Sequence, residues 1–152
     1  MTIQRIDRTA PQEQGRWRRE VLGSLSGTVL DVGAGSGASA DFLPAGVTWL
    51  ALEPAPSRRL ERAVAGRARS RLLTAGAERL PLEDATIDAV VCETYLGQPF
   101  SAPPRPEKLR KVAANCNHII TEFLKNLRPQ LSSQTALVLA VPAWRDHAGN
   151  FT

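Results

Sequence analysis

The sequence predicts an α/β protein built on a doubly wound parallel sheet, and two observations carry this prediction. Short, almost wholly apolar runs recur along the chain, a pattern typical of strands that are buried on both faces of a parallel sheet. Segments with apolar residues at helical spacing separate these runs, and strands that alternate with helices build such a sheet. The chain has 152 residues, of which 43% are hydrophobic, so it is long enough for one domain with a real core.

The first half supplies two helical segments and two strands. Residues 11–25 place their apolar side chains on one helical face, and a Ser-Gly pair ends this helix. Residues 28–32 are a short apolar run that ends in glycines, which predicts a buried strand. A helix is expected to start in residues 38–43 and to be stopped early by a proline. Residues 47–52 form the second apolar run and predict the second buried strand.

The rest of the chain continues the alternation. Residues 57–67 carry apolar side chains at helical spacing, and residues 70–74 are a candidate third strand. Residues 87–92 predict the fourth strand, after which a proline-rich loop leads to the longest helix, 107–127, with a continuous apolar stripe. Residues 136–141 predict a fifth strand, also expected to be buried, which a proline closes.

Composition excludes several classes of protein. Two cysteines are too few for a disulfide scaffold, and no apolar run reaches the roughly 18 residues that a membrane span needs. The N-terminal stretch has no secretory signal, so a cytoplasmic protein is expected. A net charge of +4 permits a nucleic-acid partner without requiring one. We interpret the cluster Arg16, Arg18 and Arg19 as a solvated helix face. The cysteines and the two histidines lack the spacing of metal ligands, so no metal is expected.

The two parts of the chain differ in composition. Residues 1–91 contain 12 arginines, whereas every lysine, asparagine, cysteine and histidine lies in residues 92–152. Chance and local surface chemistry explain this difference, or else two sequence sources meet near residues 91–93. No linker is visible there, so a single domain over 1–152 is predicted.

Three glycines follow the first strand at alternate positions: Gly33, Gly35 and Gly37. A glycine-rich turn after a buried strand lets the backbone approach a ligand closely. The spacing does not fit a phosphate-binding P-loop, because no lysine follows. The tolerant dinucleotide pattern, with Ala38 in place of the last glycine, leaves an NAD-dependent oxidoreductase as one alternative.

The run from Val29 to Gly37, in which an acidic residue precedes the glycines, resembles motif I of class I S-adenosylmethionine-dependent methyltransferases. The resemblance implies a Rossmann-like sheet with strand order 3-2-1-4-5 and S-adenosylmethionine as cofactor. Asp31 is expected to organise acceptors for the cofactor's ammonium group, and Glu53, at the end of the next strand, to accept from the ribose hydroxyls. The predicted cofactor-binding residues are Asp31, Gly33, Ala34, Gly35, Gly37, Glu53, Pro54, Ala77, Glu78 and Glu93.

Two parts of the chain resemble two different branches of this family. Residues 28–92 resemble the generic small-molecule branch, in which the segment 75–81 takes the place of a G-D-A-E-x-L-P sequence. Gly76 stands where an acidic residue commonly contacts the adenine, so adenine recognition is expected from the Ala77 backbone and from packing by Leu52 or Leu80.

Residues 93–152 resemble relatives of archaeal-type tRNA guanine-N2 methyltransferases. In those relatives an E-x-Y-L-G sequence, here residues 93–97, replaces D-P-P-Y-G. The resemblance implies that Glu93 and Tyr95 are catalytic, with Glu93 accepting a hydrogen bond from the target amine and an aromatic side chain stacking on a base. Phe100 and Trp144 are the predicted substrate-binding residues. The alternative is that Glu93 caps a loop while Tyr95 and Phe100 pack in the core.

The predicted function is therefore methyl transfer to an amino group of RNA, guanine-like in tRNA, or of a small molecule. Two further alternatives remain: a non-catalytic S-adenosylmethionine-binding domain, or part of a larger assembly. Members of the family generally continue past strand five with another helix and an antiparallel hairpin, whereas the sheet here is truncated to about five strands. A bare sheet edge predicts homodimerisation, domain swapping or a shortened chain.

Overall fold

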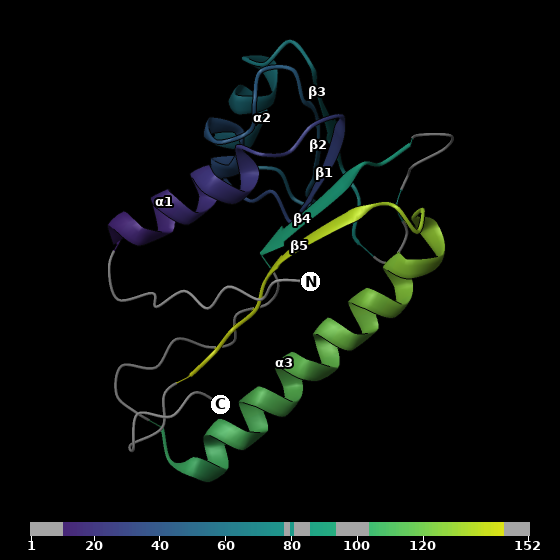
Figure 1. Ribbon diagram of the computed structural model, residues 1–152. Helices are drawn as coiled ribbons and strands as arrows, with labels where there is room; N and C mark the ends of the chain where they lie inside the picture. Colours follow the sequence, from purple (N-terminus) through teal and green to yellow (C-terminus); the bar gives the residue numbers. More distant parts are fainter. Residues whose placement is uncertain (1–10, 78–79, 81–85, 94–103, 145–152) are drawn as a thin grey trace.

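The computed structural model describes residues 11–77, 80, 86–93 and 104–144 (Figure 1). It contains one parallel sheet in the order β3-β2-β1-β4-β5, which confirms the predicted fold class and strand order. Helices α1 and α2 cover one face of the sheet, and α3 covers the other. The strands are β1 (Thr28–Val32), β2 (Thr48–Leu52), β3 (Ser70–Leu73), β4 (Ala89–Glu93) and β5 (Ala136–Ala140), and the helices are α1 (Pro11–Leu22), α2 (Arg58–Ala65) and α3 (Pro106–Leu127).

Strand β1 lies at the centre of the sheet and separates two hydrophobic clusters. Successive side chains of a strand point to opposite faces, so Val29 packs in the cluster under α1 and α2 while Leu30 packs in the cluster under α3. Leu30 pairs with Leu50 of β2 on one side and Val90 of β4 on the other. Burial on both faces explains why this strand is apolar almost throughout. The exception is Asp31, the one buried charged residue in the described part of the chain.

The helix expected in residues 38–43 is instead a single 3-10 turn, η1 (Ala38–Asp41). The residue before it, Gly37, has φ +79°, and Pro44 follows closely. Too few residues remain between these two to repay the entropic cost of nucleating an α-helix, which a 3-10 turn avoids. The next helix, α2, begins close to its predicted start because the Ser57 hydroxyl accepts a hydrogen bond from the Leu60 N–H at 3.2 Å.

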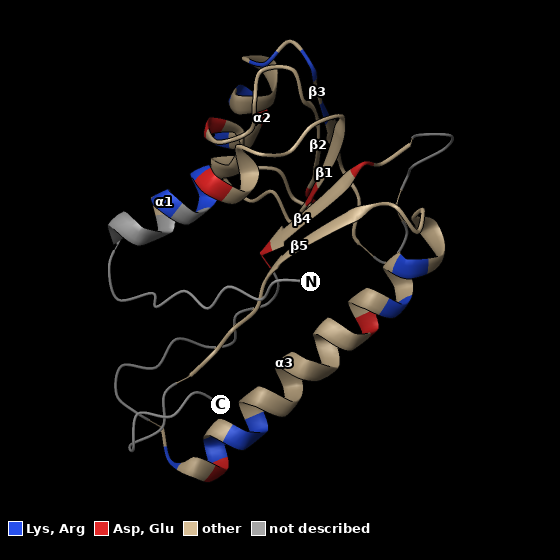
Figure 2. Cartoon of the chain, in the orientation of Figure 1, with Lys and Arg blue, Asp and Glu red and all other residues tan. Residues whose placement is uncertain are grey.

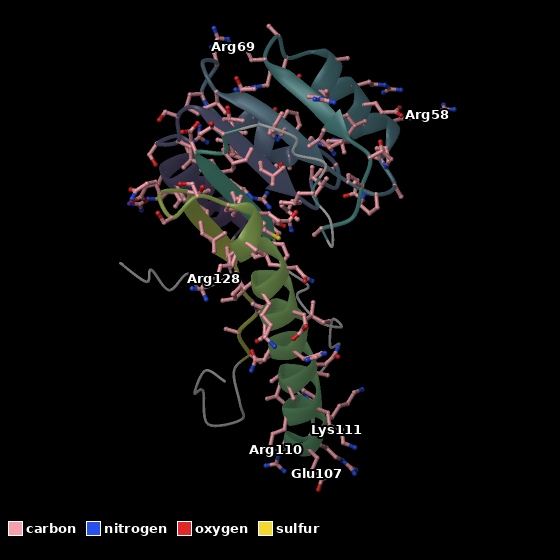
Figure 3. The ribbon with its side chains drawn as sticks, turned by 90° about the vertical axis from the view of Figure 1, so that its right-hand side faces the viewer. Arg58, Arg69, Glu107, Arg110, Lys111 and Arg128 are labelled. Carbon is pink, nitrogen blue, oxygen red and sulfur yellow. The ribbon has the colours of Figure 1, made fainter. Side chains whose placement is uncertain are left out.

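The prediction that residues 136–141 form a buried strand is wrong in one respect. Strand β5 forms as expected, at the sheet edge that the predicted strand order gives it, and among the described strands it pairs with β4, but its side chains are not buried. Leu137 is 46% exposed and Val141 55%. The apolar stripe of α3 is likewise buried in part: Leu109, Cys116 and Leu127 are buried, whereas Ile119 is 37% exposed. The end of the helix that contains Leu127 packs on the sheet, while the Pro106 end extends away from it (Figure 3). No helix among the described residues is long and apolar enough to cross a membrane.

Strand β4 also differs from the sequence prediction at both ends. It begins at Ala89 rather than at residue 87, and it includes Glu93, which was expected in the loop that follows. The reason is the register with β5, in which Glu93 pairs with Ala140. The backbone of Glu93 is therefore held by the sheet, at the carboxyl edge where parallel α/β sheets bind their ligands.

Candidate functional site

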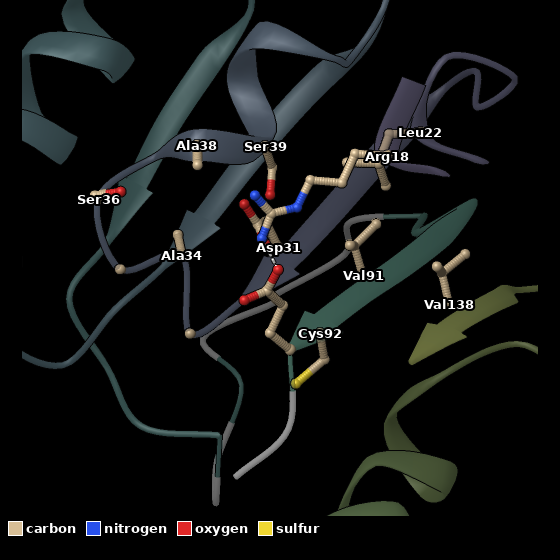
Figure 4. Close-up of a pocket in the computed structure, with 13 residues that line it drawn as sticks. Arg18, Leu22, Asp31, Ala34, Ser36, Ala38, Ser39, Val91, Cys92 and Val138 are labelled. Carbon is tan, nitrogen blue, oxygen red and sulfur yellow. Dashed lines mark hydrogen bonds and ion pairs between the residues drawn. The ribbon is translucent and has the colours of Figure 1, made fainter. Parts of the chain in front are cut away.

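A pocket of about 250 Å³ opens at the carboxyl ends of β1 and β4 (Figure 4). Parallel α/β sheets bind ligands at this edge, where the loops after neighbouring strands diverge. Five elements and the glycine loop contribute to its walls, so residues far apart in the sequence meet here. The lining residues are Arg18 and Leu22 from α1, Asp31 from β1, Gly33, Ala34, Gly35, Ser36, Ala38 and Ser39 from the loop and η1, Val91, Cys92 and Glu93 from β4, and Val138 from β5.

The glycine loop forms the floor of the pocket. Gly33 has φ +71°, a left-handed conformation that residues with a Cβ rarely adopt. A Cβ at this position would meet no other atom within 4 Å, so the space above the loop is open to a ligand. The N–H groups of Gly33 and Ala34 both donate to the Leu52 carbonyl, at 2.9 and 3.1 Å, and tie the loop to β2. The predicted loop residues 33–35 therefore line the pocket together.

Gly37 was predicted to bind the cofactor, but it does not line the pocket. A Cβ on Gly37 would lie 3.0 Å from the Ala63 Cβ and 3.2 Å from Leu60 Cδ1. This glycine is buried against α2, where it lets the helix pack closely on the loop. Its contribution is to the packing that holds the loop in place.

Glu53 lies at the end of β2, beside the glycine loop. Its Oε2 accepts a hydrogen bond from the Gly35 N–H at 3.0 Å, and its Oε1 accepts one from the Ala55 N–H at 3.4 Å. A carboxylate has further lone pairs, so both oxygens can still accept from ligand hydroxyls. The structure thus brings together the loop and the acidic strand end that the sequence singled out. The neighbouring Pro54 is exposed, and neither residue is part of the pocket wall.

Asp31 is the buried charged group of the pocket, with an exposed fraction of 3%. Its Oδ2 accepts a hydrogen bond from the Trp49 indole N–H at 3.2 Å, and the Ser39 hydroxyl also bonds the carboxylate. Burial raises the pKa of Asp31 to about 6, against the opposing effects of these two bonds and of the Arg18 charge. Trp49 and Ser39 thus hold in place a carboxylate that has lost most of its hydration.

Arg18 was not identified from the sequence as a residue of the site. Its guanidinium forms an ion pair with the Glu93 carboxylate, and the two side chains are 27% and 47% exposed. Figure 4 shows the Arg18 side chain in the pocket beside Asp31 and Ser39. The interpretation of the Arg16, Arg18 and Arg19 cluster as a solvated face is therefore wrong for Arg18. A signal existed in the helical spacing, because Arg18 precedes the buried Leu22 by four residues and shares its face.

Cys92 lines the pocket but is not a nucleophile. Burial, and to a lesser extent the charge of Asp31, raises the pKa of this thiol to about 12. Only the thiolate is reactive, so at neutral pH this side chain is an apolar part of the wall. Cys116, expected in the core, is a fully buried residue of α3.

The other predicted residues lie apart from the pocket wall. Ala77 is half-buried against the cluster that contains Leu52 and Leu80, and Trp144 is half-buried after β5. Both leucines are almost completely buried, at 1% and 7% exposed. Three predicted residues, Glu78, Tyr95 and Phe100, lie outside the described residues.

Comparison with known proteins gives a family match and several structural likenesses. A family model described as a methyltransferase domain matches residues 30–117. A search of curated proteins gives no significant match. The fold is similar to that of a 1,6-didemethyltoxoflavin-N1-methyltransferase from Burkholderia thailandensis, solved with S-adenosylhomocysteine, at 18% identity over 90% of this chain and 58% of that one, with a TM-score of 0.58.

Two further solved structures are similar. The glycopeptide N-methyltransferase MtfA, solved with S-adenosylmethionine, is 20% identical over 83% of this chain and 52% of its own, with a TM-score of 0.54. An rRNA methylase from Streptococcus thermophilus is 16% identical over 93% of this chain and 73% of its own, with a TM-score of 0.54. The chain spans about half the length of several of the structures that it matches. At these identities the likeness establishes the fold.

Proposed function

The chain belongs to the methyltransferase-domain family, whose model matches residues 30–117, and on that basis we propose that it binds S-adenosylmethionine and methylates an amino group. The observation that carries the proposal is the arrangement of Gly33, Gly35 and Glu53 beside a pocket that presents both signs of charge. Family membership favours this function over the oxidoreductase alternative.

The groups of S-adenosylmethionine have matching partners at this site. The bare backbone at Gly33 leaves room for a ligand against the loop. Glu53 has lone pairs for a ribose diol, and the Asp31 carboxylate suits an ammonium group. Arg18 is the one cation among the described residues of the pocket wall, and it suits a carboxylate. When bound, this cofactor supplies a methyl group on a sulfonium, which is an excellent leaving group.

Within that site we assign the handling of the acceptor to Glu93. Its side chain is 47% exposed at the pocket mouth, so a large acceptor can reach it. A carboxylate there accepts a hydrogen bond from the acceptor amine, aims its lone pair into the pocket and attracts the proton that the nitrogen loses. Orientation and exclusion of water account for most of the rate enhancement in such a transfer.

The charge on α3 favours RNA as the acceptor. Four exposed cations lie in residues 105–111, where Glu107 is the only acidic residue. Figure 2 shows basic residues at the start of α3, and Figure 3 places Arg110 and Lys111 where the helix extends farthest from the sheet. Clustered exposed cations bind the phosphate backbone of a nucleic acid. A small-molecule acceptor remains the second candidate, because the similar structures include enzymes named for such substrates.

Calorimetry with S-adenosylmethionine and with NAD is the first test, and we expect binding of S-adenosylmethionine alone. Asp31→Ala and Glu53→Ala should each weaken that binding. A chain that binds NAD and not S-adenosylmethionine contradicts the proposal. Methyl transfer from labelled cofactor to bulk tRNA is then compared with transfer to a panel of small amines. Cofactor binding without transfer to either indicates the non-catalytic binding domain.

A variant pair tests the RNA surface. We expect Arg110→Ala with Lys111→Ala to lower tRNA affinity and to reduce its dependence on salt concentration. Arg58→Ala with Arg59→Ala, which removes two exposed charges from the start of α2, is the matched control. Equal effects of the two pairs contradict a specific role for α3.

A further inference from the structure

The ion pair between Arg18 and Glu93 joins the two groups to which the proposed function gives different ligands. Arg18 comes from α1 and Glu93 from the end of β4, 75 residues later in the chain. Arg18 suits the carboxylate of the cofactor, whereas Glu93 suits the amine of the acceptor. In the structure the two side chains bind each other, so Arg18 has to leave Glu93 before it can bind a ligand carboxylate.

The pocket offers no second cation, among its described residues, to bind a ligand carboxylate. Arg18 also acts on Asp31, whose pKa its charge lowers, so one guanidinium already serves two carboxylates. A third carboxylate placed beside Glu93 on the same guanidinium would bring like charges into contact, which is unfavourable. The inner carboxylate, Asp31, is buried and held by Trp49, whereas Glu93 is half exposed and has no other hydrogen bond from a described residue. Glu93 is therefore the partner that can leave.

We propose that Arg18 exchanges Glu93 for the cofactor's carboxylate, so that cofactor binding releases Glu93 to receive the acceptor amine. This inference rests on the proposed function. It assigns Arg18 a positioning role, because Arg18 governs whether Glu93 is available. It also predicts an order of binding, in which the acceptor joins after the cofactor, and it makes the ion pair a competitor of the cofactor.

The direction in which Glu93→Gln changes ligand affinity distinguishes this exchange from a direct contact between Glu93 and the cofactor. If Glu93 competes for Arg18, then Glu93→Gln tightens the binding of a carboxylate-bearing ligand, because Arg18 no longer has to leave a charged partner. If Glu93 itself contacts the cofactor, as the sequence predicts, the same change weakens binding. A partly exposed ion pair contributes modestly, so the expected gain is about two- to five-fold in affinity.

The probes are S-adenosylhomocysteine and its decarboxylated analogue, measured by calorimetry on the full chain. Both probes lack the sulfonium charge, so attraction between Glu93 and a sulfonium does not affect the comparison of their affinities. We expect Glu93→Gln to tighten S-adenosylhomocysteine and not the decarboxylated analogue. Arg18→Ala should weaken S-adenosylhomocysteine about 10- to 100-fold and the analogue less than about three-fold, because a charge-assisted bond to a carboxylate is lost only in the first case. In a chain that already carries Arg18→Ala, Glu93→Gln should not increase the affinity for S-adenosylhomocysteine.

Two controls keep the outcomes distinct. Glu122→Gln removes one member of the exposed pair with Lys125 on α3 and should leave both affinities unchanged. Glu93→Asp, with a side chain one methylene shorter, replaces Glu93→Gln if that variant does not fold. Unchanged or weaker binding of S-adenosylhomocysteine by the Glu93 variant overturns the exchange, and so does an equal loss of both probes in Arg18→Ala. If the unaltered chain binds neither S-adenosylmethionine nor S-adenosylhomocysteine, the proposed function fails, and this inference fails with it.

Discussion

Replacing the buried carboxylate of Asp31 by an amide should stabilise the protein at neutral pH. Burial raises the pKa of Asp31 from 3.8 to about 6, while the unfolded chain keeps an ordinary aspartate. The folded protein therefore binds more protons than the unfolded chain between these two pKa values. Stability from this group is fully present below pH 3.8 and is lost as the pH rises through 6. The shift corresponds to about 3 kcal/mol of unfolding free energy.

Asp31→Asn keeps an oxygen that can accept from the Trp49 indole and removes the charge. It also removes the attraction to Arg18, which offsets part of the gain. At pH 7.5 we expect the variant to be more stable than the original chain by about 1–3 kcal/mol. At pH 4, where Asp31 is mostly protonated in the folded state, the advantage should disappear.

Urea denaturation from pH 4 to pH 8, followed by tryptophan fluorescence, measures this difference. Other carboxylates titrate in both proteins, so subtraction isolates the contribution of Asp31. Asp41→Asn, at an exposed aspartate in η1, is the control and should change stability by less than about 0.5 kcal/mol. A difference between Asp31→Asn and the original chain that does not vary with pH would refute the reasoning. The same variant should bind S-adenosylmethionine more weakly, since the ammonium would lose its carboxylate partner.

Three further predictions follow from the fold. Gly37→Ala should cost about 2–4 kcal/mol in urea denaturation, because a Cβ there is both strained and in contact with α2, whereas Gly46→Ala, in open space, should change little. A thiol reagent at pH 8 should leave Cys92 and its buried counterpart unmodified until urea unfolds the chain, and rapid reaction without urea contradicts their burial. Leu137 on β5, which is 46% exposed, should pack against a second copy, so light scattering should report twice the 16.5 kDa chain mass, and Leu137→Lys should restore the monomer; a monomer without the substitution contradicts this prediction.

The sheet was largely predictable from sequence because its signals are local. Strand β1 matches its predicted bounds, since an apolar run followed by glycines depends only on neighbours in the chain. The short turn η1 was misjudged because its length is set by Gly37 and by Pro44 together. The exposure of β5 was misjudged for a different reason. A strand's own residues indicate that it pairs, but whether other segments cover its side chains is decided elsewhere in the fold.

The residues of the candidate site show the same difference between local sequence signals and features set by distant parts of the fold. The loop glycines and Glu53 carry a motif with fixed spacing, and the structure brings them into contact. Arg18 carries no motif, because its place depends on how α1 packs against β4, across 75 residues of sequence. No pattern in the sequence of the first helix shows that Arg18 will lie beside the end of β4. Its position only four residues before a core leucine shows that it faces inward, but not what it meets there.

Arg18 interacts with the carboxylates of Asp31 and Glu93, which differ in their depth in the pocket. Asp31 is 3% exposed and held by an indole, so a macromolecular acceptor cannot reach it. Glu93 is 47% exposed at the mouth. A cofactor has to lie deep for its methyl group to be shielded from water, whereas the acceptor enters from outside. Under the proposed function the inner carboxylate therefore faces the cofactor's ammonium and the outer one faces the acceptor's amine. Because the Arg18 guanidinium interacts with both carboxylates, binding of the acceptor amine at Glu93 depends on earlier binding of the cofactor.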